Sequence, residues 1–547
     1  MGFDYKIVSS MEKVFSSGKN IQEMKEKKLS GLKGENVSFQ IAYYWDEKIK
    51  KFGSFEVTSP IQDFVRVREV KLVPCEYPCH MEQDEGYLAT EPGMYPDLLS
   101  EIGEFGFPLI SGHWKSLWID VEITEDMEAG SYPLKLELKT KDEALCTVEM
   151  EIEVIDVALL KLPIPHTEWF HCDGLATYYN VEVFSEEHWR IIEEFVKTAV
   201  KHKCNMLLTP VFTPPLDTGV GYERRTVQLV DVTVEDGAYQ FEFSKFHRWV
   251  EMAQRCGVEY FEISHLFSQW GAFAAPKIMA KKDGKYQKIF GWETEAAGEE
   301  YSEFLHQFLP ALKKELKTLG IEKNTYFHVS DEPNEEQLES YQKAVKVVEK
   351  DLEGYPVIDA LSHYEFYQRG IAKQPVCCLD YLHYFLKAED CPEKLWGYYC
   401  TGQTKKVSNR FIVLPGYRTR ILGTQLYKFQ LSGFLHWGYN FYNSQYSLYP
   451  IDPYRCTDSG GAFPSGDPFL VYPGKGGKPE ESIRLMLMDE AMSDYCALKA
   501  LEKVAGREVV MACIEEDAVI EFEEYPQSSA WILKMRERVH QMLKNIK

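Results

Sequence analysis

The chain lacks the marks of several large classes of protein. No run of about 18 consecutive apolar residues occurs in it, and its amino terminus has no positively charged segment that leads into an apolar run. It also has no HExxH motif, no P-loop and no GxGxxG motif. We therefore expect no insertion into a membrane, a cytoplasmic location without a signal peptide, and no nucleotide cofactor.

Paired cysteines and metal-ligand spacings are also missing. The thirteen cysteines are scattered without a CxxC pair, and Cys75 and Cys79 have no second pair to match them. His171 and His265 do not have the spacing of metal ligands. We expect reduced, mostly buried thiols, no metal and no cofactor.

Positive charge is scarce relative to negative charge. The 61 Lys and Arg residues face 85 Asp and Glu residues, which gives a net charge of -24 and an isoelectric point near 5.2. This balance argues against nucleic acid or an anionic membrane as the main partner. Aromatic residues make up 14% of the chain, enough for a large core and for a surface that stacks on a ligand. The sequence indicates no oligomeric state.

Residues 1–160 predict an antiparallel β-sandwich domain. Apolar residues alternate with polar ones in several runs, such as Leu117, Ile119, Val121 and Ile123. A period of two indicates strands with one buried face and one wet face. Residues 74–114 interrupt this pattern with many Pro, Gly, Tyr and Glu residues. A long insertion of this kind is expected to pack at an interface between domains.

After a stiff linker at residues 161–165, short apolar runs alternate with helical patterns. Repeated strand–helix units predict a parallel sheet, and eight of them predict a closed (β/α)8 barrel of the TIM type over residues 161–505. The candidate strands are 168–171, 205–209, 260–265, 325–331, 356–360, 376–380, 395–400 and 433–437. Residues 506–547 read as an extension, with possible strands at 509–514 and 519–522 followed by a basic helix.

One predicted strand, 325–331, ends in two adjacent carboxylates, Asp331 and Glu332. Pro333 follows, and it disfavours helical backbone at Glu332, so the strand is predicted to stop there. Asn334 then begins a helix as its N-cap, with Gln337 at the capping-box position. Catalytic groups of α/β barrels lie at the carboxyl ends of the strands. We therefore expect Asp331 and Glu332 to be catalytic.

Two neighbouring acids suit the cleavage of a glycosidic bond, in which a carboxylic acid protonates the leaving oxygen. An ionised neighbour raises the pKa of the other acid, which keeps it protonated near neutral pH. A separate nucleophile is missing at the ends of the seventh and eighth strands, and Asp380 after the sixth is the best spare acid. Adjacent acids instead suit attack by the substrate's own 2-acetamido oxygen. In that arrangement Asp331 orients the amide and Glu332 protonates the leaving group.

Aromatic and polar side chains gather in the loops after four of the predicted strands. Aromatic rings stack on the apolar C–H face of a sugar, and polar groups satisfy its hydroxyls. We expect the substrate-binding residues to be His171, Asp173, Asp217, His265, Gln269, Trp270, His436, Trp437, Tyr439, Asn440 and Tyr442, with Tyr399 as a further candidate for the amide pocket.

From about residue 32 to residue 501 the chain resembles glycoside hydrolase family 123 and a related group defined only as a domain of unknown function. The matching stretches are Tyr95-Pro-Asp97, Ser330-Asp-Glu-Pro333, the aromatic segment 436–443, and Ser482-Ile-Arg-Leu485 with Asp494 and Tyr495. The Asp-Glu pair is the most specific of these.

The resemblance implies an exo-acting, retaining β-N-acetylhexosaminidase with N-acetylgalactosamine (GalNAc) favoured. It also implies an amino-terminal β-sandwich, a (β/α)8 barrel, and substrate-assisted catalysis through an oxazoline-type intermediate on a glycan or glycoconjugate. Asp331 becomes the amide-orienting residue and Glu332 the general acid/base. Two alternatives stay open: a glycosidase for a sugar without a 2-acetamido group, and a non-catalytic carbohydrate-binding protein.

Overall fold

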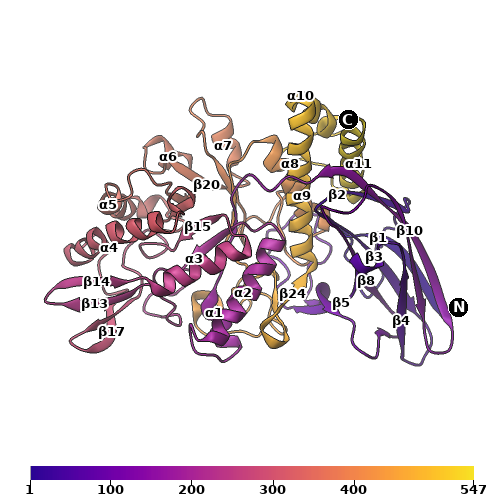
Figure 1. Ribbon diagram of the computed structural model, residues 1–547, viewed down its shortest axis with the longest axis horizontal. Helices are drawn as coiled ribbons and strands as arrows, with labels where there is room; N and C mark the ends of the chain where they lie inside the picture. The colour runs from indigo at the N-terminus through magenta and orange to yellow at the C-terminus, as the bar shows by residue number, and fades with distance from the viewer. Residues whose placement is uncertain (1, 362, 547) are drawn as a thin grey trace.

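The computed structural model describes residues 2–361 and 363–546. Two packed sheets near the amino terminus lie beside a barrel of strands and helices, and the long helix α9 (Ile483–Ala505) stands between them (Figure 1). No helix within the described ranges combines the length and the apolar character needed to span a bilayer.

The amino-terminal region consists of a seven-stranded and a five-stranded sheet. Its predicted antiparallel pairing is confirmed, except that β2 runs parallel to β10. The alternating apolar side chains, such as Phe39, Ile119 and Leu136, are fully buried in one cluster. In order across the sheets, the strands are β1 (Phe3–Ser9), β3 (Glu35–Trp45), β8 (His113–Ile123), β5 (Val65–Cys75), β6 (Gly93–Glu101), β24 (Pro479–Ser482) and β23 (Tyr472–Pro473), and then β2 (Lys28–Lys33), β10 (Ala144–Ala158), β9 (Gly130–Lys139), β4 (Lys51–Thr58) and β7 (Phe107–Leu109).

Two of these strands, β23 and β24, come from far along the chain. Strand β24 pairs with β6, with Ser482 opposite Leu98. Just beyond it, Arg484 forms a buried bidentate ion pair with Asp97 of β6, at 2.8 Å to each carboxylate oxygen. The amino-terminal sheet is therefore completed by residues that follow the barrel strands. The division of the chain into domains at residues 160 and 505 stays a prediction.

The inserted segment 74–114 does pack against the barrel. The Tyr87 hydroxyl donates to the Thr404 carbonyl at 2.9 Å, and the Leu88 amide donates to the Val413 carbonyl at 3.0 Å. These contacts show that the segment packs against the barrel; its place at an interface between domains stays a prediction.

All eight predicted barrel strands are present, each shorter than its predicted range or shifted by two residues. They form a parallel sheet in the order β18-β15-β12-β11-β22-β21-β20-β19, and the two edge strands approach each other where the Phe327 amide donates to the Pro356 carbonyl at 2.9 Å. The barrel is therefore nearly closed. The strands are β11 (His166–Glu168), β12 (Met206–Thr209), β15 (Tyr260–Ile263), β18 (Thr325–Phe327), β19 (Ile358–Ala360), β20 (Gln374–Cys378), β21 (Trp396–Tyr398) and β22 (Phe434–His436).

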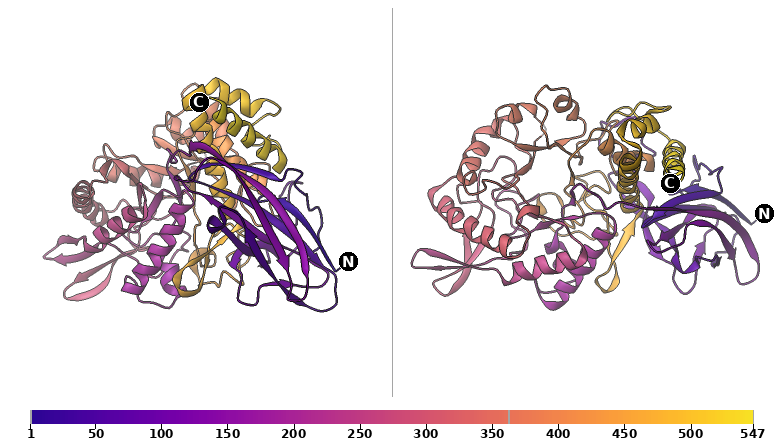
Figure 2. Two further views of the ribbon diagram at one scale, coloured as in Figure 1. Left: turned by 45° about the vertical axis from the view of Figure 1, so that its right-hand side comes forward. Right: turned by 45° about the horizontal axis from the view of Figure 1, so that its top comes forward.

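Helices separate the successive barrel strands and surround them (Figure 2). They bury an apolar face, as α2 does with Trp189, Ile192 and Phe195. These helices are α1 (Cys172–Tyr178), α2 (Glu186–Lys201), α3 (Ser244–Cys256), α4 (Glu299–Thr318), α5 (Leu338–Val348), α6 (Tyr364–Gln368), α7 (Leu382–Leu386) and α8 (Gly416–Lys428).

The loops after β12 and β15 contribute a small sheet that the sequence did not reveal. Its order is β14 (Ala238–Glu242), β13 (Asp231–Glu235), β16 (Ile278–Lys282) and β17 (Lys285–Phe290). This sheet extends away from the barrel, on the side opposite the amino-terminal sheets (Figure 1). Two loops of the predicted active face are thus tied to each other by strand pairing.

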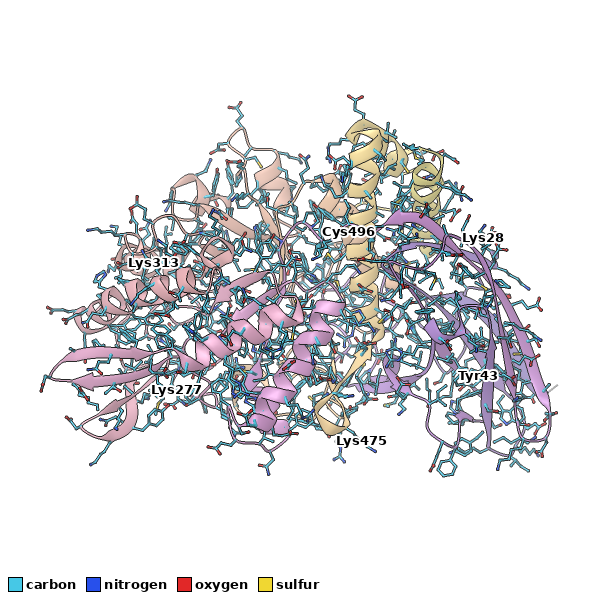
Figure 3. All side chains as sticks on the ribbon, viewed as in Figure 1. Lys28, Tyr43, Lys277, Lys313, Lys475 and Cys496 are labelled. Carbon is cyan, nitrogen blue, oxygen red and sulfur yellow. The ribbon has the colours of Figure 1, made fainter. Side chains whose placement is uncertain are left out.

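The carboxyl-terminal prediction is half right. The stretch 509–514 lies in a helix, α10 (Arg507–Glu515), because its apolar residues Val510, Cys513 and Ile514 face inward at helical spacing. Residues 519–522 form no strand either. The predicted basic helix is present as α11 (Ser529–Asn545). Cys496, one of eight buried cysteines, lies on α9 between the sheets and the barrel (Figure 3).

Candidate active site

Asp331 and Glu332 follow β18 at the carboxyl edge of the barrel. Glu332 has a φ of +41°, a left-handed conformation that a non-glycine residue adopts at a cost. The predicted capping box is present after Pro333, because Asn334 and Gln337 each accept from the other's backbone amide. The chain therefore turns sharply at Glu332 before it enters α5.

Residue Glu332 is exposed as a whole, but its carboxylate is partly desolvated and is hydrogen-bonded. The Tyr398 hydroxyl donates to Glu332 Oε1 at 2.7 Å. Desolvation of the carboxyl raises the pKa of Glu332, and the Tyr398 hydrogen bond opposes that rise because it stabilises the ionised form. Glu332 is thus reachable by a substrate and poised to hold a proton.

The pKa of Asp331 is raised well above its ordinary value. Burial contributes most, and the charge of the adjacent Glu332 adds to it, whereas the cationic His328 lowers it. Two carboxyls that influence each other in this way titrate as a pair. The pair holds a proton at pH values where isolated carboxyls are ionised.

A buried network of charged side chains surrounds His328, which lies three residues before Asp331 in the chain. His328 bridges the carboxylates of Glu262 and Asp359. Burial alone would lower the pKa of His328, but the hydrogen bonds to these two carboxylates outweigh it and raise the pKa to about 9. Asp359 also accepts from the Val329 amide at 3.0 Å and from the Tyr341 hydroxyl. The network therefore holds a cation and fixes the backbone just before Asp331 and Glu332.

His265 stacks on His328, with ring centroids 4.2 Å apart and planes 17° from parallel. Neither ring nitrogen of this buried histidine has a hydrogen-bond partner among the described residues. Burial and the nearby His328 charge hold the pKa of His265 well below its usual range, so the ring is neutral. Trp169 meets both rings edge-on, and its indole N–H donates to Glu262 at 2.7 Å.

Three predicted binding residues lie next to the pair. The Trp270 amide donates to the Asp331 carbonyl at 2.8 Å, and the Asp217 amide donates to the Gln269 side chain at 2.5 Å. Burial raises the pKa of the Asp217 carboxyl to about 6, and the Asp217 charge in turn contributes to the raised pKa of Asp331. The loops after β12 and β15 thus bring Asp217, Gln269 and Trp270 to Asp331 and Glu332.

The model of a known family, described as glycoside hydrolase 123, catalytic domain, matches residues 169–501. The chain belongs to glycoside hydrolase family 123. It is therefore a glycosidase, and its substrate is a glycan. No curated protein sequence matches the chain.

Among solved structures, the chain is similar to a family 123 glycoside hydrolase from Clostridium perfringens, described for glycolipid glycan hydrolysis. The identity is 14%, the match covers 100% of this chain and 97% of that chain, and the TM-score is 0.74. A Bacteroides ovatus GH5 xyloglucanase matches at 9% identity over 86% of this chain and 98% of that chain, with a TM-score of 0.29. A fold similarity this low does not support a comparison of sites.

In this family 123 glycosidase, three other predicted residues form a structural cluster. Asp173 pairs with the buried Arg224 at 2.6 Å, and Arg224 also contacts His171 Nδ1 at 3.1 Å. Asn440 accepts from the His171 amide at 2.8 Å, and His171 Nε2 lies 2.9 Å from the Trp437 carbonyl. Burial and the Arg224 charge lower the pKa of His171 to about 3. The structure uses these side chains to join the loops after β11 and β22.

His436 and Trp437 both contact Asp467. The Trp437 indole N–H donates to Asp467 at 2.8 Å, and His436 Nε2 lies 3.3 Å from the same carboxylate. Burial raises the pKa of Asp467 to about 7, against the lowering effect of Arg410. Trp437 is half-buried and packs with the side chains inside the barrel. Asp467 is an acid near the interior that the sequence did not single out.

The structure does not bring Tyr399, Tyr439 or Tyr442 to the barrel mouth. All three are buried, and their hydroxyls contact Met488, the Phe195 carbonyl and the Val471 carbonyl. Side chains alternate along a strand, so Tyr398 points into the barrel and its neighbour Tyr399 points out. The sequence predicted Tyr399 as a binding residue, whereas the residue that donates a hydrogen bond to Glu332 is its neighbour Tyr398.

Among the described residues, no group of three or more His, Cys, Asp or Glu side chains is placed to hold a metal ion. The titratable groups of this site are the carboxyls of Asp331 and Glu332. Their neighbours are the Tyr398 hydroxyl and the cationic His328.

Proposed function

We propose that this glycosidase is an exo-acting, retaining enzyme that releases a terminal β-linked N-acetylhexosamine, with GalNAc favoured. The catalytic unit is a (β/α)8 barrel of the TIM type. The observation that carries the proposal is the adjacent pair Asp331 and Glu332, both with raised pKa values, at the carboxyl edge of the barrel strands. The similarity to an enzyme described for glycolipid glycan hydrolysis supports a glycoconjugate substrate.

The first step breaks the glycosidic bond without an enzyme nucleophile. The acetamido oxygen of the substrate attacks the anomeric carbon, and Glu332 gives its proton to the leaving oxygen. Asp331 accepts a hydrogen bond from the amide N–H and stabilises the positive charge that grows on the oxazoline-type ring. In the second step, the Glu332 carboxylate takes a proton from water, which opens the ring with retention of configuration.

The surroundings of the pair support this division of roles. The positive charge of His328 favours the ionised form of Asp331. A substrate amide that donates a hydrogen bond to Asp331 favours that form further. Tyr398 donates to Glu332, so it stabilises the carboxylate that remains after Glu332 has given up its proton. The shared proton of the pair therefore moves to Glu332 when substrate binds.

A second candidate function rests on Asp217. Its amide donates to the Gln269 side chain, and the next residue, Trp270, donates through its amide to the Asp331 carbonyl, so Asp217 lies near the acid pair. This proximity favours Asp217 as the nucleophile if the substrate has no acetamido group. Asp380, the spare acid predicted from the sequence, accepts instead from the Gln403 side chain at 3.2 Å.

A thiazoline that mimics the bicyclic intermediate separates the two candidates. Substrate assistance predicts competitive inhibition of the wild-type enzyme and much weaker inhibition of the Asp331→Asn variant, because the variant loses the anionic partner of the ring nitrogen. An active enzyme that is insensitive to the thiazoline would contradict substrate assistance and favour Asp217 as nucleophile.

A further inference from the structure

Exposed or partly exposed aromatic rings lie on three loops at the barrel mouth. Tyr222, in the loop after β12, is 54% exposed, and Tyr446, after β22, is 40% exposed. Tyr446 meets Trp270, from the loop after β15, edge-on at 5.7 Å between ring centroids. A Cβ atom on Gly219 would lie 3.1 Å from Tyr446 and 3.2 Å from Tyr222, so both tyrosines border this glycine. Together with Trp292, these three rings are named the aromatic rim.

Trp270 and Tyr446 form the end of the aromatic rim that lies beside Asp331 and Glu332. The Trp270 amide is bonded to the Asp331 carbonyl. The Tyr446 amide donates to the Asp217 carboxylate at 3.0 Å, and the Asp217 charge acts on Asp331. These contacts place Trp270 and Tyr446 beside the acid pair, where a group attached to a sugar at Asp331 would meet them.

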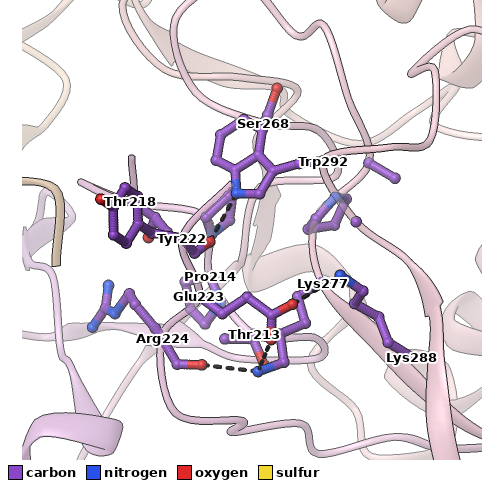
Figure 4. Close-up of a pocket in the computed structure, with 14 residues that line it drawn as sticks. Thr213, Pro214, Thr218, Tyr222, Glu223, Arg224, Ser268, Lys277, Lys288 and Trp292 are labelled. Atoms are coloured by element: carbon purple, nitrogen blue, oxygen red, sulfur yellow. Dashed lines mark hydrogen bonds and ion pairs between the residues drawn. The ribbon is translucent and has the colours of Figure 1, made fainter. Parts of the chain in front are cut away.

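The other end of the aromatic rim enters a pocket, shown in Figure 4. The Trp292 indole N–H donates to the Tyr222 carbonyl at 2.9 Å. Glu223 is held between Lys277 at 2.9 Å and Lys288 at 2.8 Å. The remaining lining includes Pro214, Pro215, Thr213, Thr218, Ser268 and Arg224. Aromatic faces beside hydroxyl and charged groups are the composition that a sugar chain needs.

The backbone of the aromatic rim is held in an unfavourable conformation. Trp270 and Tyr446 of the aromatic rim, and the neighbouring Ser447 and Asp217, all have positive φ angles, between +39° and +59°. Hydrogen bonds hold the segments together: the Gly219 amide donates to the Tyr446 carbonyl at 3.0 Å, and the Ser447 hydroxyl donates to the Asp217 carbonyl at 2.7 Å. Strain that the surroundings maintain in this way collects at binding and catalytic sites.

We propose that the aromatic rim and its pocket bind the leaving-group side of the substrate, an oligosaccharide chain attached to the terminal hexosamine. This inference rests on the proposed function and adds where the rest of the glycan lies. The rings stack on the C–H faces of successive sugars, and the polar lining meets their hydroxyls. A lipid chain fits the pocket less well, because it would desolvate Glu223, Lys277 and Lys288 without replacing their contacts with water.

The test compares two substrates with the same terminal hexosamine, an aryl glycoside and an unlabelled oligosaccharide. Replacement of Tyr446 or Tyr222 by Ala is expected to lower kcat/KM for the oligosaccharide about tenfold and for the aryl glycoside less than about twofold. Tyr446→Phe keeps the ring and is expected to behave like the wild type. Tyr286→Ala is the matched control, because Tyr286 is 63% exposed on β17 and is not part of the pocket lining.

Several outcomes would overturn the proposal. Equal losses of kcat/KM for the two substrates would show that the tyrosines contact the terminal sugar. Unchanged kcat/KM for both would show that the aromatic rim does not bind the substrate. The oligosaccharide is also tested free and linked to a lipid; equal effects support the proposal, and an effect confined to the lipid-linked form refutes it. A wild-type enzyme that cleaves neither hexosaminide defeats the proposed function, and the inference with it.

Discussion

The core between the two amino-terminal sheets and the interior of the barrel bury different kinds of side chain. Between the sheets, apolar residues such as Phe39 and Leu136 are fully buried against one another. Inside the barrel, Glu262, His328 and Asp359 are each no more than 2% exposed. Buried charges cost free energy that an apolar core does not, even when they are paired. The comparison teaches that the core between the sheets is apolar, whereas the barrel interior also contains buried charges that act on the protonation of the acid pair.

The backbone shows the same contrast. Among the described residues up to 160, Asn20 is the one non-glycine residue with a clearly positive φ. Six such residues lie on the loops around the acid pair, or belong to it: Asp217, Trp270, Ala272, Glu332, Tyr446 and Ser447. The loops of the site therefore contain several strained backbone positions, and the amino-terminal sheets almost none.

The largest expected effect comes from the acid pair. Glu332→Gln is expected to lower kcat roughly a thousandfold for a natural glycan, whose leaving oxygen needs a proton, and far less for an activated aryl glycoside. Asp331→Asn is expected to reduce both rates, because both depend on attack by the acetamido oxygen. Rates measured across a series of leaving groups check this. Identical behaviour of the two variants would contradict the roles assigned here.

A matched pair of substitutions tests the comparison of the two regions. His328→Gln leaves Glu262 and Asp359 without their cation and is expected to cost about 3 kcal/mol of the free energy of unfolding. Leu136→Ala, between the amino-terminal sheets, is expected to cost a similar 2–5 kcal/mol or so. The loss of the cation also raises the pKa of Asp331, so in His328→Gln the acidic limb of the activity profile moves to higher pH. In Leu136→Ala that limb stays in place.

The pH dependence of stability gives a second check on His328. Its pKa is raised to about 9 by its two carboxylate partners, so its contribution is fully present below the ordinary histidine pKa and is lost as the pH rises through about 9. The stability difference between the wild type and His328→Gln is therefore expected to shrink above that pH. Denaturation curves across the pH range measure it, and a constant difference would contradict a charged His328.

A smaller effect is expected from Tyr398. Its hydroxyl stabilises the ionised form of Glu332, so Tyr398→Phe is expected to raise the pKa of the general acid and to move the basic limb of kcat/KM upward by about half a pH unit. Tyr399→Phe is the control, because the Tyr399 hydroxyl faces Met488 outside the barrel. A shift of the same size in both variants would show that Tyr398 does not act through Glu332.

The sequence predicted the elements that are set by local pattern. The alternating apolar residues of the amino-terminal sheets, the eight barrel strands and the capping box at Asn334 all follow from short-range periodicity or from side-chain chemistry. The Asp331–Glu332 pair was identifiable because two acids and a proline end a β-branched run.

What the sequence did not predict depends on contacts between distant segments. Strand β24 pairs with β6 at a distance in sequence that no local pattern encodes. The short apolar run in α10 was predicted as a strand, because which of its residues are buried is known only from the structure. The barrel strands are only three to five residues long, so an error of one position exchanges Tyr398 for Tyr399. His328 was overlooked because its charge arises from Glu262 and Asp359, which are remote in the chain.

The most direct test of the account is the hydrolysis of matched aryl β-GalNAc, β-GlcNAc and β-galactoside substrates by the purified wild-type enzyme. The account predicts cleavage of the acetamido sugars alone, with GalNAc preferred, because the acetamido oxygen is the nucleophile. Cleavage of the plain galactoside at a comparable rate would contradict it and would move the search for a nucleophile to Asp217.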